Sequence, residues 1–185
     1  MRTIDRVFCW SVAAFVLLLA GASNAADCDI RLSEREVDYG RLHRGELLDE
    51  QPGQRLISLE KRTLTLSIAC QRPSLINLRF NALSAEPQTF SFGQRGNFSV
   101  VIGDALVDGQ AATWVHEHKE AQTAATWQTF EAGQSLVALI AGVPARARVV
   151  TAQIEVQARL AAQATHVSDE TRIEAIGAFE LIADE

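Results

Sequence analysis

The segment RTLTLSIAC, residues 62–70, decides the fold, because apolar and polar side chains alternate along it at every second position. The apolar side chains that would share one face are Leu64, Leu66, Ile68 and Cys70. The polar side chains that would share the other face are Thr63, Thr65 and Ser67. A period of two is typical of a β-strand with one buried face. The segment therefore predicts a core strand of a β-sheet.

The same alternation returns along most of the chain that follows. It recurs in SLINLRFNA (residues 74–82), directly after a break at Pro73, and in ARVVTAQIEVQARL (residues 147–160). Shorter segments of the same kind are TFSFG (89–93), NFSVVIGDALVDG (97–109), QSLVALIAG (134–142) and TRIEAIGAFELI (171–182). About eight short strands separated by turn residues predict an all-β antiparallel sandwich rather than alternating strands and helices.

The first 25 residues have the features of an export signal. Two arginines precede an apolar run at residues 12–20, and small residues stand where a signal peptidase recognises its site, so we expect cleavage before Ala26. This divides the chain into a signal peptide, residues 1–25, and one β-sandwich domain, residues 26–185. The apolar run is shorter than the roughly 18 to 20 residues that span a bilayer, so we expect no transmembrane segment after the signal is removed.

Charge and motifs exclude several classes of function. Two of the 17 basic and one of the 23 acidic residues lie in the signal, so 15 basic and 22 acidic residues remain. This excess of acid disfavours a nucleic-acid partner. Neither a GxSxG turn nor a glycine-rich phosphate loop occurs. We therefore expect no enzyme, no catalytic residues and no cofactor.

Only two cysteines remain after the signal is removed, Cys28 and Cys70. An even pair in an oxidising compartment is expected to be bonded, and the alternative is two free buried thiols. Closing a loop of this length would stabilise the fold by about 4 kcal/mol in the chain-entropy model.

Several of these segments together resemble one known family. They are VDYGRL (37–42), KRTLTLSIAC (61–70), LRF (78–80), FSFGQRGNFSVVIGDALVDG (90–109) and ETRIEAIGAFELI (170–182). They are similar to exported subunits of chaperone–usher fimbriae, especially a β-fimbrial group often described only as a domain of unknown function. The resemblance implies an incomplete immunoglobulin-like antiparallel β-sandwich that lacks its last strand and keeps an open apolar groove.

The resemblance also implies partners. A periplasmic chaperone would lend a strand to the groove, and at the outer-membrane usher the N-terminal extension of a neighbouring subunit would replace it. The protein would thus pass through the periplasm to a fimbrium at the cell surface. The family's disulfide joins the first strand to the second, where Cys28 and Cys70 fall here.

Particular residues follow from this expectation. The core strands expected to leave the groove are built on Leu64, Leu66, Ile68, Val150, Ile154 and Val156. The C-terminal strand expected to contact the chaperone carries Phe179, Leu181 and Ile182.

The position in the fibre depends on the cleavage site. Only Ala26 and Asp27 would precede Cys28. Because a residue extends the chain by at most about 3.6 Å, these two could not fill a neighbour's groove. We therefore expect a minor or tip subunit that accepts a strand without donating one. Cleavage further upstream is the alternative, and it would leave a donor strand.

A second hypothesis is a free periplasmic or secreted binding module with a complete sandwich. The near repeat AATW ends at Trp114 and again at Trp127, and two indoles could bind a sugar ring or a surface. The alternative for each tryptophan is packing on the sandwich. His116 and His118 could offer two imidazoles to a metal, but a solvated loop is favoured because no third ligand stands at a recognisable spacing. We expect no metal site.

Overall fold

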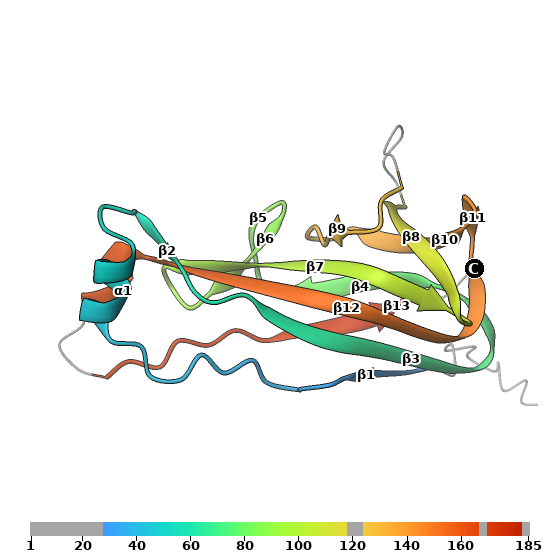
Figure 1. Ribbon diagram of the computed structural model, residues 1–185, viewed down its shortest axis with the longest axis horizontal. Coiled ribbons are helices and arrows are strands. Elements are labelled where there is room, and N and C mark those ends of the chain that lie inside the picture. Colours follow the sequence, from blue (N-terminus) through green and yellow to red (C-terminus); the bar gives the residue numbers. More distant parts are fainter. Residues whose placement is uncertain (1–27, 118–123, 167–169, 183–185) are drawn as a thin grey trace, which may run out of the picture.

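Antiparallel strands make up most of the chain, and the part of it that the structure describes also contains one short helix and one 3-10 turn (Figure 1). The structure, a computed structural model, describes residues 28–117, 124–166 and 170–182. The first strands and the helix are β1 (Cys28–Leu32), α1 (Arg44–Glu50), β2 (Leu56–Ser58), β3 (Arg62–Leu75), β4 (Asn77–Ala82), β5 (Ser84–Glu86) and β6 (Thr89–Phe92). The later elements are β7 (Gly96–Val107), β8 (Gln110–His116), β9 (Gln128–Thr129), β10 (Ser135–Ile140), β11 (Val143–Pro144), β12 (Arg146–Ala161), η1 (Ala162–Thr165) and β13 (Gly177–Leu181).

The main strands form two layers that enclose one core. Their hydrogen-bonded order is β1-β3-β12-β7-β8-β10-β4-β13, and all of the pairings are antiparallel. One layer contains β1, β3, β12 and β7, the hairpin of β7 and β8 connects the layers, and β10, β4 and β13 complete the second layer. The predicted fold class, an incomplete immunoglobulin-like β-sandwich, is confirmed.

The long strands β3, β12 and β7 form the centre of the first layer, in the register that the alternation predicts. Leu64 lies opposite Ile154, and Ile68 lies opposite Val150. On its other side Ile154 pairs with Ile102 of β7. All five side chains are buried, so one face of each strand contributes to the core.

Five phenylalanines fill the half of the core next to β4 and β13. The Phe80 ring centroid lies 4.9 Å from that of Phe90 and 4.9 Å from that of Phe179. Phe98 and Phe130 lie slightly farther from Phe80, at 6.1 and 6.2 Å. Edge-to-face and tilted contacts at these distances are favourable for aromatic rings. Phe80 is therefore the hub of this cluster.

Cys28 and Cys70 form a disulfide that ties β1 to β3. The two cysteines lie directly opposite each other in the register of the two strands, so the bond reinforces a pairing that the main chain also makes. The expected bond is confirmed, and the alternative of two free thiols is wrong.

Candidate functional site: an open groove between two edge strands

β1 and β13 are the two ends of the hydrogen-bonded strand order, and within the described residues they do not pair with each other. Each continues as an extended segment, residues 33–43 after β1 and residues 170–176 before β13 (Figure 1). From residue 34 to residue 42 the main chain makes no hydrogen bond to another described main-chain group. Unpaired N–H and C=O groups of this kind are a template for a further strand.

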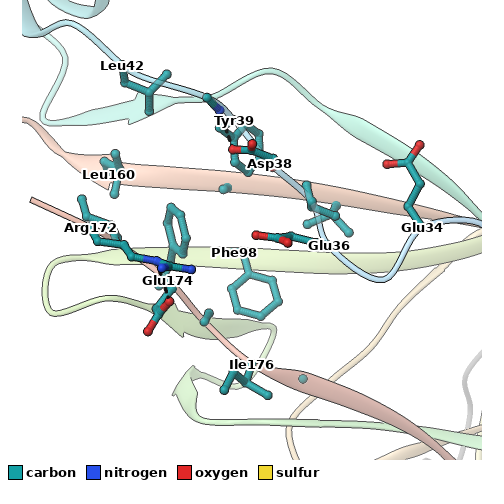
Figure 2. Close-up of a pocket in the computed structure, with 18 of the residues that line it drawn as sticks. Glu34, Glu36, Asp38, Tyr39, Leu42, Phe98, Leu160, Arg172, Glu174 and Ile176 are labelled. Carbon is teal, nitrogen blue, oxygen red and sulfur yellow. Dashed lines mark hydrogen bonds and ion pairs between the residues drawn. The ribbon is translucent and has the colours of Figure 1, made fainter.

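A groove of about 1190 Å³ opens between these two segments. Its walls are residues 34–44 and 170–177, and Figure 2 shows side chains from both walls around the opening. The floor is apolar and includes Leu64, Phe80, Phe98, Ile154, Val156 and Phe179. Val156 and Phe179 are only half-buried, whereas the other four are nearly covered by their neighbours. The groove therefore reaches the aromatic cluster.

The six residues that were expected on the strands forming the groove lie in two different environments. Leu64, Ile154 and Val156 line the groove. Leu66, Ile68 and Val150 lie toward the disulfide end of the same strands, where they are fully buried in the closed part of the core. The strands β3 and β12 thus run from a closed core into an open one.

The three C-terminal residues also differ in their surroundings. Phe179 lines the groove and contacts Phe130, with ring centroids 5.5 Å apart. Leu181 is half-buried opposite Leu78 of β4. The Ile182 N–H donates a hydrogen bond to the Asn77 carbonyl, at 2.8 Å. Phe179 is therefore the one of the three that an occupant of the groove would touch.

Tyr39 fixes the N-terminal wall to the sheet, a role that the sequence analysis missed. Its ring lies 6.4 Å from the Phe92 ring, and the Arg62 guanidinium carbon lies 5.7 Å from the Tyr39 ring centroid. Burial raises the pKa of Tyr39, against the opposing effects of the Ala158 backbone and the Arg62 charge. The available signal was the lone tyrosine of VDYGRL, which stands two residues after the apolar Val37 and directly before a glycine.

Gly177 is the second residue that the sequence analysis missed. A Cβ atom built on Gly177 would lie 2.2 Å from Cζ of Phe80, so the ring packs directly against this stretch of main chain. Only glycine allows that approach. It lets β13 lie close to the aromatic cluster at the edge of the groove.

The two tryptophans do not form a common surface. Trp114 is fully buried, so the structure assigns it to the core, as the packing alternative predicts, and its indole is not available to an external ligand. Trp127 is 37% exposed, and its ring covers Gly103, where an added Cβ atom would come within 2.1 Å of the indole. A surface role thus remains a prediction for Trp127 alone.

The histidine segment is partly described. His116 is buried, and its Nε2 lies 3.8 Å from Oε1 of Glu131. His118 lies outside the described residues. Among the residues that the structure describes, no group of three or more His, Cys, Asp and Glu side chains is arranged to hold a metal ion. The same residues contain no helix that is long and apolar enough to cross a membrane.

Comparisons with known proteins give two similarities. No family model matches the chain. The uncharacterized protein YhcE of Escherichia coli (strain K12) is 26% identical over 95 residues, which are 51% of this chain and 51% of YhcE, so the match covers about half the length of that relative. The crystal structure of the P pilus rod subunit PapA superposes with a TM-score of 0.43 and 10% identity, over 86% of this chain and 100% of PapA.

Proposed function

We propose that this chain is an exported subunit of a chaperone–usher surface fimbria and that it functions by accepting a strand from another protein into its groove. The observation that carries the proposal is the apolar groove of about 1190 Å³ between two edge segments, of which residues 34–42 make no hydrogen bond to another described main-chain group. The sequence motifs that resemble fimbrial subunits point to the same function.

A strand is the occupant that satisfies both the walls and the floor. Neighbouring strands lie about 4.8 Å apart, so an inserted strand would pair its main chain with the unpaired groups of residues 34–42. Every second side chain would then point to the floor and cover Val156 and Phe179, which are half-buried. Covering apolar surface stabilises by about 25 cal/mol per Å².

The partners of the proposal are a periplasmic chaperone, an outer-membrane usher and a neighbouring subunit. The chaperone would fill the groove after export and removal of residues 1–25, with Phe179 and the adjacent Leu181 and Ile182 in the strand it contacts. The domain would then comprise residues 26–185. The Cys28–Cys70 disulfide fits an oxidising compartment such as the periplasm.

The finer proposal is a minor or tip subunit that contacts a surface, with Trp127 as the residue to mutate first. It depends on cleavage before Ala26, which N-terminal sequencing of the exported protein measures. Immunogold labelling at the fibre tip would support it, and labelling along the shaft would contradict it. The alternative, a free ligand-binding module, requires a complete sandwich, and the open groove argues against it.

The test uses a synthetic peptide with alternating apolar residues. We expect it to raise the melting temperature of the exported protein by several degrees, because about 1 kcal/mol of stabilisation corresponds to roughly 2 to 4 °C at this size. Val156→Glu, which puts a charge in the groove, should abolish the shift. Thr151→Glu, on the same strand but facing the opposite way, is the matched control and should retain it. A wild-type protein without a shift, or an equal shift in V156E, would overturn the proposal.

A further inference from the structure

The N-terminal wall of the groove carries a row of carboxylates. Val37 and Tyr39 are half-buried against the core, whereas Glu34, Glu36 and Asp38 are exposed. Glu36 and Asp38 alternate with the half-buried Val37 and Tyr39, so these two carboxylates lie on the side that faces away from the core, and Glu34 precedes them as a third exposed acid. Figure 2 shows the carboxylate of Glu36 projecting from this wall at the opening of the groove.

These charges are not neutralised within the described part of the chain. Neither Glu34 nor Glu36 forms an ion pair or a side-chain hydrogen bond there. Asp38 accepts a hydrogen bond of 2.7 Å from the Gly40 N–H through Oδ1, which leaves its negative charge in place. Arg35 stands between the two glutamates at the alternate position, so the run from residue 34 to residue 38 has three acids and one base.

The opposite wall differs, because each of its charged side chains has an oppositely charged partner, which for Glu170 is Arg41 of the N-terminal wall. Arg172 Nε lies 2.9 Å from Oε2 of Glu174. Glu170, at the start of this wall, lies 3.8 Å from Arg41. Ile176, the next outward position after Glu174, is 87% exposed and uncharged. Arg41 and Arg44 at the far end of the N-terminal wall balance its charge over residues 34–44 as a whole, so the excess of negative charge that an inserted strand would meet is confined to residues 34–38, beside Glu34, Glu36 and Asp38.

We propose that the groove selects a strand from another chain whose inward side chains are apolar and whose outward side chains are lysine or arginine. This inference rests on the proposed function, since it names the chemistry of the strand that the groove accepts. Outward side chains of an inserted strand would be cross-strand neighbours of the three acids, where opposite charges stabilise and like charges destabilise a pair. The acids thus attract a basic strand and also reject an acidic one, which are the two components of specificity.

The test compares three peptides that share their inward apolar residues and carry Lys, Gln or Glu at every outward position. Their dissociation constants for the exported protein are measured by fluorescence anisotropy at low and at high salt. We expect the Lys peptide to bind about tenfold more tightly than the Glu peptide at low salt, with the Gln peptide between them. The ratio should fall at high salt, because exposed charges are screened.

Two variants test whether the acids of the N-terminal wall cause the preference for the Lys peptide. E34Q/E36Q should reduce the Lys-to-Glu ratio to about threefold or less. E86Q neutralises an exposed glutamate on β5 that does not line the groove, and it should keep the full ratio.

The outcomes separate this inference from the proposed function. If the Gln peptide binds and the three peptides have equal affinities, or if E34Q/E36Q keeps the ratio, the charge selection is wrong and the strand-accepting groove stands. If none of the peptides binds, both proposals are overturned. Self-association of the protein alone that V156E abolishes, measured by sedimentation, would assign the groove to a second copy and would also overturn the inference.

Discussion

Gly177→Ala is expected to destabilise the protein although it adds only a methyl group. The added Cβ atom would lie 2.2 Å from Cζ and 2.7 Å from Cε2 of Phe80, far inside ordinary contact distance. The ring cannot move away easily, because its centroid is 4.9 Å from both Phe90 and Phe179. The methyl group must therefore displace β13 from β4 or push Phe80 into the groove.

The size of the effect follows from two opposing contributions. Overpacking a well-filled core costs about 1 to 3 kcal/mol. Replacing glycine by alanine restricts the unfolded chain and returns about 0.4 to 1 kcal/mol. Gly177 has no positive φ, so backbone strain adds nothing to the cost. We expect a net loss of about 1 to 2 kcal/mol, which lowers the melting temperature by roughly 2 to 8 °C.

The assay is thermal and denaturant unfolding of wild type, G177A and the control G45A. A Cβ atom on Gly45, in α1, meets nothing within 4 Å, so G45A should be neutral or slightly stabilising. In an F80L background, without the ring, G177A should cost at least about 1 kcal/mol less, as a double-mutant cycle would show. An unchanged melting temperature in G177A, or the same cost with and without the ring, would refute the steric argument.

Three further predictions concern the disulfide, the single tyrosine and the tryptophans. Replacing Cys28 and Cys70 by serine opens a loop with a sequence separation of 42 and should cost about 4 kcal/mol in guanidinium unfolding; an unchanged midpoint would contradict it. Tyr39 is the only tyrosine, and burial raises its pKa above the value near 10 of the unfolded chain. Its contribution to the free energy of unfolding is therefore full below about pH 10 and is lost as the pH rises through the pKa of Tyr39 in the folded protein. Absorbance near 295 nm should show the late titration in the native state, and Y39F should remove this part of the alkaline loss of stability; a native titration at or below pH 10 would argue against the burial. W114A should cost about 3 to 5 kcal/mol because the indole is fully buried, whereas W127A should cost clearly less, and equal unfolding midpoints would count against the assigned positions.

The alternation in the sequence is sufficient to predict which segments form core strands, but it does not predict where a strand at the edge of the sheet begins. The pattern of residues 62–70 predicts the face that is buried, and β3 buries Leu64, Leu66 and Ile68 as expected. The segment TRIEAIGAFELI alternates equally well, yet only Gly177–Leu181 is a strand. A strand needs a partner, and residues 170–176 have none alongside β4. Alternation reports which side chains could share a face, and it does not report whether a neighbouring strand is present.

The tryptophans show a second limit of prediction from local sequence. The two AATW repeats are identical, but Trp114 points inward from β8 whereas Trp127 lies over Gly103 near the surface. Their difference arises from register and from a glycine in another strand, which no window around the tryptophan contains. The roles of Tyr39 and Gly177 could not be predicted from the sequence for the same reason, because each depends on one aromatic ring distant in sequence.

The groove wall is held at both ends, and this affects how an entering strand would bind. At one end the Cys28–Cys70 bond fixes β1 to β3, and at the other Tyr39 packs on Phe92. Between these anchors the main chain of residues 34–38 makes no hydrogen bond to another described main-chain group, so its pairing groups remain free. Binding costs less when one partner is already ordered, because less conformational entropy is lost on association. If the groove accepts a strand as we propose, a wall fixed at its ends and unpaired in its middle would lower the entropic cost of binding that strand, and its carboxylates would add selection by charge without requiring the wall to reorganise.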